Sequence, residues 1–252
     1  MVNRDDLVTF LDELLKINDI PGDKSANGLQ VEGSVTVGKV VGAVDACQET
    51  YRAAVAAGGE FIFVHHGEFW SSLSGIRGRI AERFRLLFQS DLSLYAAHLP
   101  LDAHPELGHN AEIARLLGLQ NRTAFAEYCG ACIGFHGELP EAMSCDDLAA
   151  LINAKLDTTC QVYNPGLDKF RRIGIISGGG ASSIEECAEL ELDCLVTGEV
   201  NHTWYHPIQE LGVALITAGH YKTEVPGILT VLDAITKKFG IETEFIDIPT
   251  GL

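Results

Sequence analysis

Residues 41–68 read VGAVDACQETYRAAVAAGGEFIFVHHGE, and residues 173–199 read IGIISGGGASSIEECAELELDCLVTGE. Each stretch starts with an apolar run of strand length, passes through a turn into a helical pattern, and returns to a second apolar run. Both stretches close on the dipeptide Gly-Glu. This order of strand, helix and strand, with short connections, is typical of an α/β protein with a largely parallel sheet.

The similarity between the two stretches continues further along the chain. Residues 92–102, LSLYAAHLPLD, match residues 213–224, VALITAGHYKTE, in the same relative order. The alignment superposes two pairs of polar residues: His98 on His220, and Asp102 on Glu224. One such match could arise by chance, but two in the same order favour a duplicated α/β unit.

The duplication predicts two α/β repeats, the first in residues 1–122 and the second in residues 123–252. No Pro- or Gly-rich linker separates them, so we expect them to pack closely or to intertwine, with mixed, largely parallel sheets. Strands are predicted at residues 39–44, 60–65, 92–97, 170–176, 193–197 and 213–217. Helical patterns lie between them, at residues 47–58, 76–89, 183–191 and 203–212.

The charge balance limits the partners of the protein. Its 18 Lys and Arg residues stand against 35 Asp and Glu residues, which gives a net charge of −17. Such a chain repels nucleic acid and anionic membranes unless positive charge is concentrated locally, and no run of Lys or Arg does so. No apolar run approaches the roughly 20 residues that a membrane span needs. We expect no membrane association, and nucleic acid is disfavoured as a partner.

The cysteines and the N-terminus indicate a compartment. Seven cysteines, an odd number scattered along a long chain, favour free thiols in a reducing compartment over a disulfide framework. The first residues, MVNRDDLVTFLDELL, form an amphipathic helical pattern and lack the basic start and apolar centre of a signal peptide. We therefore expect the protein in the cytoplasm.

Histidines and carboxylates follow several predicted strands at the point where each strand ends. Ligands of open α/β sheets bind outside these carboxyl ends. Adjacent side chains of a regular strand point to opposite faces, so His65 and His66 reach one site only where Gly67 turns the chain. Each histidine or carboxylate alone has an ordinary structural explanation, but equivalent strand ends favour a common site. Five residues take this position: His65, His66, Asp102, His220 and Glu224.

Three imidazoles and two carboxylates suit divalent ions of intermediate softness, namely Zn²⁺, Fe²⁺, Mn²⁺ or Ni²⁺. Ca²⁺ would recruit mostly oxygen ligands. Five ligands exceed the four of a closed tetrahedral zinc site, but they serve two ions when a carboxylate bridges. A pair of ions roughly 3.5–4 Å apart can activate a water molecule and stabilise a leaving oxygen. The residues therefore predict a dinuclear metal site.

Two further residues and a glycine run lie near this site in the sequence pattern. His98 and Glu199 are predicted to orient ligands or to move protons. The run Gly178-Gly179-Gly180 leads from a strand into a helix, where its amides could bind an anion. It has neither the ending of a Walker loop nor a GxGxxG pattern. A tight strand-to-helix turn explains the run equally well, and both interpretations stay open.

Five segments in order carry a family pattern: SANGLQVEG (25–33), FVHHGEFW (63–70), AAHLPLDAHPELGHNAEIARLLGL (96–119), TGEVNH (197–202) and AGHYKTE (218–224). Together they resemble the Nif-three-like family, whose bacterial members are often labelled GTP cyclohydrolase I type 2 homologues. The resemblance covers nearly the whole chain. It implies two intertwined α/β repeats, a toroidal homohexamer and a dinuclear metal centre. Position by position, it places the family's ligands on the same five residues, His65, His66, Asp102, His220 and Glu224.

Two functions follow from these features. The first is a metal-dependent hydrolase acting on a small nucleotide-like or phosphorylated substrate, with GTP ring opening as its most concrete version. The second is a non-catalytic metal-binding or regulatory homohexamer. No residue pattern identifies a guanine pocket or a pterin-forming base, so the choice stays open at this point.

Overall fold

The computed structural model of the chain describes residues 1–71 and 75–252. The chain divides into two compact units. The first unit comprises residues 1–101 and 228–248, and the second comprises residues 102–227 and 249–252. The repeat boundary between residues 122 and 123 remains a prediction, because it concerns internal sequence similarity whereas the compact units are defined by contacts.

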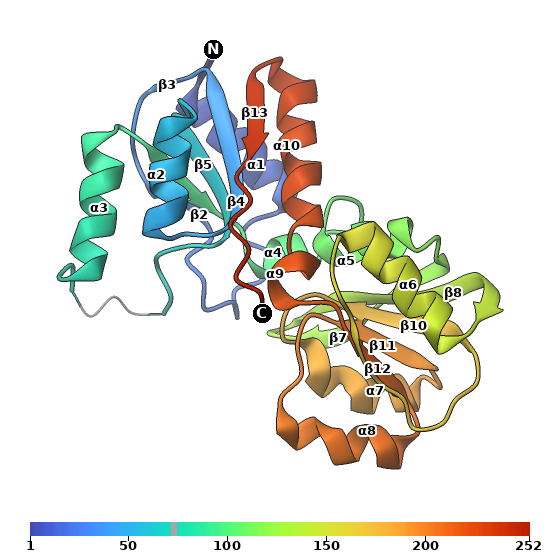
Figure 1. Ribbon diagram of the computed structural model, residues 1–252. Coiled ribbons are helices and arrows are strands. Elements are labelled where there is room, and N and C mark those ends of the chain that lie inside the picture. Colours follow the sequence, from blue (N-terminus) through green and yellow to red (C-terminus); the bar gives the residue numbers. More distant parts are fainter. Residues whose placement is uncertain (72–74) are drawn as a thin grey trace. The chain divides into compact units, whose positions relative to one another are not determined.

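The first unit is built on a five-stranded sheet with the order β13-β4-β5-β6-β2 (Figure 1). Neighbouring strands are parallel except β2, which runs antiparallel to β6. The strands of the first unit are β1 (Val2–Asn3), β2 (Gly28–Val31), β3 (Thr36–Val37), β4 (Lys39–Asp45), β5 (Phe61–His66), β6 (Ser93–Ala96) and β13 (Glu242–Phe245). Its helices are α1 (Arg4–Leu15), α2 (Gln48–Ala56), α3 (Arg79–Gln89), and most of the short α4 (Leu99–Asp102) and of α10 (Pro226–Phe239).

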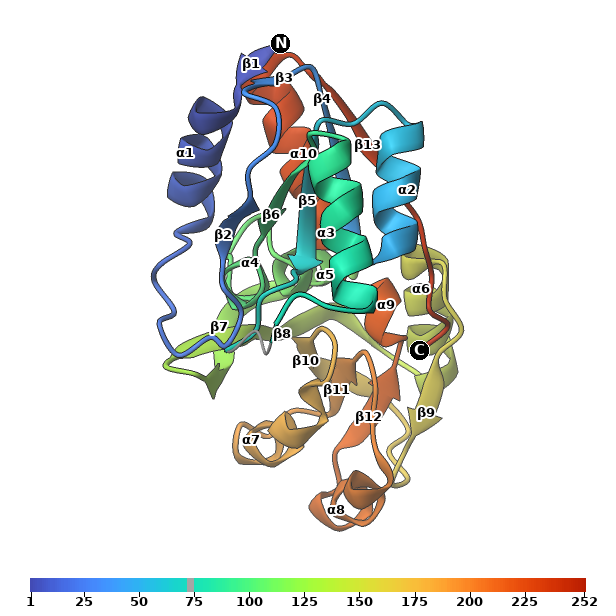
Figure 2. The same ribbon diagram turned by 90° about the vertical axis from the view of Figure 1, so that its left-hand side faces the viewer.

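Alternate residues of the central strand β5 enter different cores. Phe61 and Phe63 belong to a core with residues of α1 and α10, whereas Ile62 and Val64 belong to a core with residues of α2 and α3. Figure 2 shows α1 and the pair α2 and α3 on opposite sides of this sheet. A parallel strand covered on both faces is apolar throughout, so β5 forms a continuous apolar run as far as its two histidines.

The second unit contains a six-stranded sheet with the order β7-β8-β10-β11-β12-β9. The central strands β10, β11 and β12 are parallel, and the outer strands join them antiparallel. The strands are β7 (Gln120–Tyr128), β8 (Ala131–Met143), β9 (Gln161–Tyr163), β10 (Phe170–Ile176), β11 (Cys194–Thr197) and β12 (Ala214–Thr217). The helices are α5 (His109–Leu116), α6 (Cys145–Leu156), α7 (Ile184–Glu189), α8 (Tyr205–Leu211), α9 (His220–Thr223) and the 3-10 turns Gly180–Ser183 and His202–Trp204.

The same alternation organises the second unit. Cys194 and Val196 of β11 pack in a core with α5 and α6, whereas Leu195 packs with α7 and α8. Helix α6 is capped by Ser144, the residue before it, whose hydroxyl accepts a hydrogen bond from the Asp147 amide at 3.2 Å. Such a cap satisfies an amide that the helix itself leaves without a partner.

The α/β fold with mixed sheets is confirmed. All six strands predicted from apolar runs form, within one or two residues of the expected bounds, and each unit contains three consecutive parallel strands, β4-β5-β6 and β10-β11-β12. Helix α3 starts three residues later than the helical pattern beginning at residue 76 predicted. Strands β2 and β7, each at the edge of its sheet and antiparallel to its neighbour, are not among the predicted strands.

Two expectations from composition concern the whole chain. Among the residues that the structure describes, all seven cysteines carry free thiols, as the odd number predicted. The described helices include none that is both long and apolar enough to cross a membrane.

Candidate metal site

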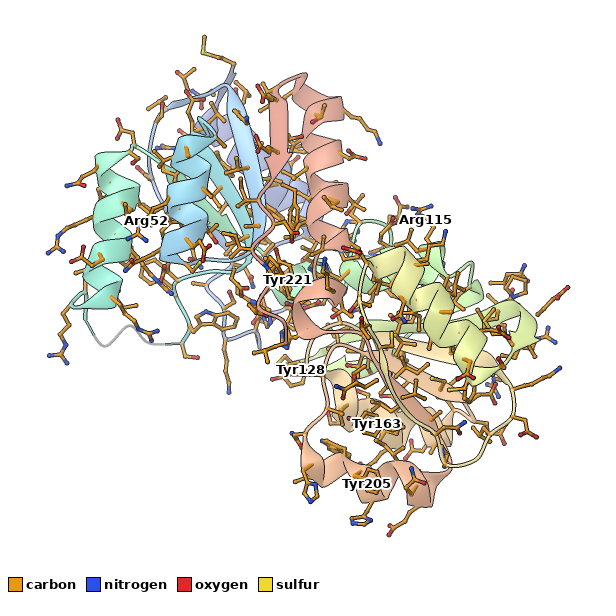
Figure 3. All side chains as sticks on the ribbon, in the orientation of Figure 1. Arg52, Arg115, Tyr128, Tyr163, Tyr205 and Tyr221 are labelled. Carbon is orange, nitrogen blue, oxygen red and sulfur yellow. The ribbon has the colours of Figure 1, made fainter. Side chains whose placement is uncertain are left out.

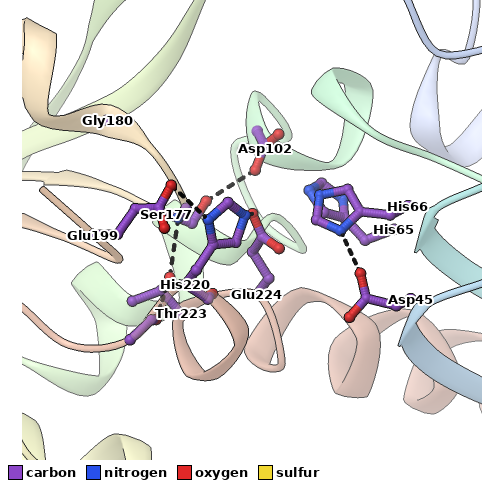
Figure 4. Close-up of polar contacts among 12 residues, drawn as sticks. Asp45, His65, His66, Asp102, Ser177, Gly180, Glu199, His220, Thr223 and Glu224 are labelled. Atoms are coloured by element: carbon purple, nitrogen blue, oxygen red, sulfur yellow. Dashed lines mark hydrogen bonds and ion pairs between the residues drawn. The ribbon is translucent and has the colours of Figure 1, made fainter. Parts of the chain in front are cut away.

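The first unit brings two adjacent histidines together at the end of β5. His65 is fully buried and its Nδ1 lies 3.0 Å from the Ala97 carbonyl oxygen. The Nδ1 of His66 lies 2.8 Å from Oδ1 of Asp45, the last residue of β4 (Figure 4). The two rings are 4.6 Å apart. In the neutral tautomer that fits each of these contacts, Nδ1 carries the proton and Nε2 is the nitrogen that could bind a metal ion.

His98 joins this cluster from the end of β6. Its Nδ1 lies 2.9 Å from Oδ1 of Asp23. Burial alone would raise the pKa of Asp23, but hydrogen bonds from His98 and Asn27 outweigh burial and lower it to about 2. Asp23 is therefore a lasting anionic acceptor for His98. One nitrogen from each of His65, His66 and His98 lies within 4.8 Å of the others, a grouping that could hold a metal ion.

The second unit brings together the other predicted residues. His220 lies between two carboxylates, with Nε2 3.1 Å from Glu224 Oε1 and Nδ1 3.3 Å from Glu199 Oε1 (Figure 4). The hydrogen bond to Glu224 raises the pKa of His220 to about 9, against the opposing effect of burial. A cation that binds both His220 Nε2 and Glu224 Oε1 must displace the proton that these two atoms share.

Asp102 and Glu224 are buried carboxylates of the same unit, with 6% and 3% of their surface exposed. The Ser177 hydroxyl donates to Asp102 Oδ1 at 2.9 Å. Glu224 lies beside Gly178, the residue that follows Ser177. A Cβ atom at Gly178 would approach Glu224 Oε1 to 2.4 Å and His220 Nε2 to 3.1 Å. Gly178 also has a φ of +60°, which favours glycine. The turn after β10 therefore lets both ligand candidates approach the backbone closely.

The glycine run forms contacts within the second unit. The Gly178 amide donates to the Thr223 hydroxyl and the Gly180 amide to the Thr197 hydroxyl, each at 3.0 Å. These bonds and the space that Glu224 needs account for the glycines as a tight turn. The predicted anion site at Gly178, Gly179 and Gly180 stays a prediction.

The two Gly-Glu dipeptides have different roles in the two units. Glu68 is buried, accepts a hydrogen bond from the Tyr51 hydroxyl at 2.7 Å and forms an ion pair with Arg83 at 3.1 Å. The side chain of Glu199 is 55% exposed and contacts His220. Glu68 therefore connects α2 and α3 to the turn after β5, whereas Glu199 remains accessible for chemistry.

Removing the Tyr51 hydroxyl tests the structural role of Glu68. We expect Tyr51→Phe to lower the free energy of unfolding by about 1.5–3 kcal/mol, because a buried carboxylate loses a donor. The matched control is Tyr163→Phe. The Tyr163 side chain is labelled in Figure 3, its hydroxyl donates an exposed hydrogen bond to Gln161, and the loss of this bond should cost less than about 0.5 kcal/mol. Urea unfolding measures both variants, and equal losses would contradict the assignment.

A cavity of about 550 Å³ lies within the second unit, and Glu199 forms part of its lining. Its lining includes Glu199, Asp157, Lys222 and Thr217, together with three residues near the end of the chain, Pro249, Gly251 and Leu252. The volume falls within the range of small-molecule sites, and Lys222 is its basic side chain, paired with Asp157 at 3.2 Å.

Sequence reasoning missed the residues that hold the candidate ligands in place. Asp45 could have been found, because it is the next residue after the predicted strand 39–44 and so lies at a strand's carboxyl end. Asp23 and Ser177 carry no such signal. Asp23 precedes His98 by 75 residues in a loop, and Ser177 precedes a glycine run that a tight turn is enough to explain.

Comparisons with known proteins match this chain over nearly its whole length. A family model described as Duf34/NIF3 (NGG1p interacting factor 3) matches residues 2–251. A "GTP cyclohydrolase 1 type 2 homolog" from Pyrococcus abyssi is 42% identical over 252 residues, covering 100% of both chains. A protein of the same name from Escherichia coli is 38% identical over 246 residues, covering 96% of this chain and 98% of its own. A solved structure from Thermus thermophilus has a TM-score of 0.92 at 38% identity, with 100% of both chains covered.

Proposed function

The chain belongs to the DUF34/NIF3 family, and from that premise we propose that it is a metal-dependent hydrolase with a dinuclear centre. The proposed ligands are His65, His66, Asp102, His220 and Glu224. The observation that carries the proposal is the anchoring of His65 and His66 through Nδ1, which directs the Nε2 lone pair of each to a ligand.

The residues present fit a pair of divalent ions. Asp102 and Glu224 are buried carboxylates, and burying negative charge is costly unless a cation or strong donors compensate it. Imidazoles and carboxylates together suit Zn²⁺, Fe²⁺, Mn²⁺ or Ni²⁺ better than Ca²⁺. Bound ions would supply an acidified water molecule and stabilise negative charge on a leaving oxygen.

The remaining residues have roles that do not depend on the identity of the ions. Glu199 is more than half exposed, touches His220 and lines the cavity of the second unit, so it can carry a proton to or from a molecule bound there. The cavity itself would hold the part of the substrate that does not react. His98, fixed by Asp23, is a second candidate for moving a proton.

The substrate that we propose is a small nucleotide-like or phosphorylated molecule. The name of the relatives, GTP cyclohydrolase 1 type 2 homolog, makes GTP ring opening the most concrete version. In that version Glu199 or His98 would move protons while water adds to the imidazole ring of the base. We further propose a homohexameric ring in the cytoplasm, which light scattering and fractionation of cells would test.

Replacing Glu199 by Gln tests the catalytic proposal. We expect turnover of GTP or of a phosphoester to fall about 10²–10⁴-fold, because the amide cannot carry a proton. Metal content at saturating ion concentration should match that of the unaltered protein, because Glu199 contacts the proposed ligand His220 but is not itself a proposed ligand. Steady-state kinetics and elemental analysis of the metal-reconstituted protein measure the two quantities.

The alternative function is a non-catalytic metal-binding or regulatory homohexamer. A broad screen of metal-reconstituted protein that finds no turnover above the background of His66→Ala would refute the hydrolase and leave this alternative. Metal content well below one ion per chain after gentle purification would count against both.

A further inference from the structure

A loop of the first unit is built around one side chain, that of His98. Asp23 accepts hydrogen bonds from His98 Nδ1 and the Ser25 amide through Oδ1, and from the Asn27 side chain and the Leu99 amide through Oδ2, all at 2.9–3.0 Å. Asn27 in turn accepts from the His98 backbone amide at 2.8 Å. Four donors on one carboxylate hold both the backbone and the imidazole of His98 in one orientation.

This arrangement gives His98 the same chemistry as its two neighbours. Asp23 Oδ1 faces His98 Nδ1 and also accepts from the Ser25 amide, so the neutral tautomer that fits this contact has its proton on Nδ1 and its lone pair on Nε2. The Ala97 carbonyl and Asp45 impose the same form on His65 and His66. The ring of His98 lies 5.0 Å from that of His65 and 5.7 Å from that of His66.

We propose that the first unit alone binds one divalent ion through the imidazoles of His65, His66 and His98, with Asp23 as the positioning residue of His98. One nitrogen from each ring lies within 4.8 Å of the other two, a spacing consistent with three ligands of one ion. Three histidines with an open fourth position are an established donor set for zinc, and neutral imidazoles favour Zn²⁺, Co²⁺ or Ni²⁺ over Mg²⁺ and Ca²⁺.

This site shares His65 and His66 with the proposed dinuclear centre but needs no ligand from the second unit. It therefore assigns His98 as a ligand, not only as a residue that orients ligands or moves protons. An ion held by the first unit alone would persist when the carboxylates of the second unit are removed. That property separates the two proposals in experiment.

Trp70 provides a local reporter for the site. Its indole Nε1 donates to the Gly67 carbonyl at 2.9 Å, and its ring lies 4.9 Å from His98 and 6.0 Å from His66. The chain has two tryptophans, Trp70 and Trp204, so Trp204→Phe leaves Trp70 as the sole source of indole fluorescence. Bound Co²⁺ is paramagnetic and should quench it at this distance.

The experiment titrates Co²⁺ into the full chain carrying Trp204→Phe, His220→Ala and Glu224→Gln, which lacks two proposed ligands of the second unit. We expect one Co²⁺ per chain, visible as quenching of Trp70 and as d–d absorption. In this background, His98→Gln should weaken binding more than about 100-fold, and Asp23→Asn about 10–100-fold. His206→Gln, an exposed histidine on α8, is the control for nonspecific binding and should change nothing.

Thermal unfolding of each variant shows whether it is folded. If His98→Gln does not fold, Asp23→Asn still tests the proposal, because it keeps the size of the side chain. Unchanged Co²⁺ affinity in either folded variant would overturn the proposal. The proposal would also fail if Co²⁺ did not quench Trp70 in the protein that carries only Trp204→Phe, His220→Ala and Glu224→Gln. The dinuclear proposal is judged separately, on the unaltered chain. If that chain binds one ion, which His98→Gln removes and Glu224→Gln does not, the dinuclear centre fails and the three-histidine site stands.

Discussion

Glu224→Gln is expected to remove most of the metal from the second unit's half of the proposed centre, weakening binding there by more than about a hundredfold. Loss of a residue that only orients a ligand costs about 10–100-fold, and loss of a ligand should cost more. Gln keeps the size of the side chain and removes its charge. The effect therefore reports the carboxylate and not a cavity at a position that is 3% exposed.

The measurement is elemental analysis of protein reconstituted with Zn²⁺ or Mn²⁺ and then dialysed against a weak chelator. We expect about two ions per chain in the unaltered protein, the number that the five ligands serve, and at most about one in Glu224→Gln. Glu185→Gln, an exposed glutamate on α7 in the same unit, is the matched control and should retain the full content. Full content in Glu224→Gln would remove Glu224 from the ligand set.

Gly178→Ala is expected to disrupt the same half of the centre without replacing a proposed ligand. The new Cβ would lie 2.4 Å from Glu224 Oε1 and 3.1 Å from His220 Nε2, so the side chains of both residues must move. Overpacking of this kind typically costs about 1–3 kcal/mol. The φ of +60° adds about 1–2 kcal/mol for any residue with a side chain.

A second glycine, Gly212, separates the steric cost of Gly178→Ala from the cost of placing a side chain at a positive φ. Gly212 ends α8 with a φ of +69°, and a Cβ there would meet nothing within 4 Å. Gly212→Ala should therefore lose only the conformational contribution and keep its metal, whereas Gly178→Ala should lose more stability and bind metal at least about tenfold more weakly. Urea unfolding and metal titration measure both variants. Equal metal affinity in the two would show that close approach at Gly178 is not required.

The candidate ligands were predictable because parallel α/β sheets expose strand ends at one edge. The apolar runs before His65 and before His220 identify buried strands, and the first polar residue after each run is where a ligand can be reached. The internal repeat paired Asp102 with Glu224, and both are buried carboxylates in the structure. Local periodicity thus determined the strands, the fold class and the positions of the five proposed ligands.

Tertiary structure decided what surrounds these residues. The sequence pairs Glu68 with Glu199, yet Glu68 is buried against Tyr51 and Arg83, whereas Glu199 is exposed beside His220. His98 owes its orientation to Asp23, a partner 75 residues away. Likewise β13, near the end of the chain, adds a parallel strand next to β4 of the first unit.

The physical reason is the range of the interactions. Burial on one or two faces of an element imposes a period of a few residues, and such a period is visible in any short window of the sequence. The hydrogen bond between His98 and Asp23 depends on loops that are brought together only when the unit has folded, and so does the close approach of Glu224 to Gly178, where a Cβ atom would clash. The sequence alone therefore determined the strand ends and the residues on them, and the folded structure decided which of those residues are anchored, buried or accessible.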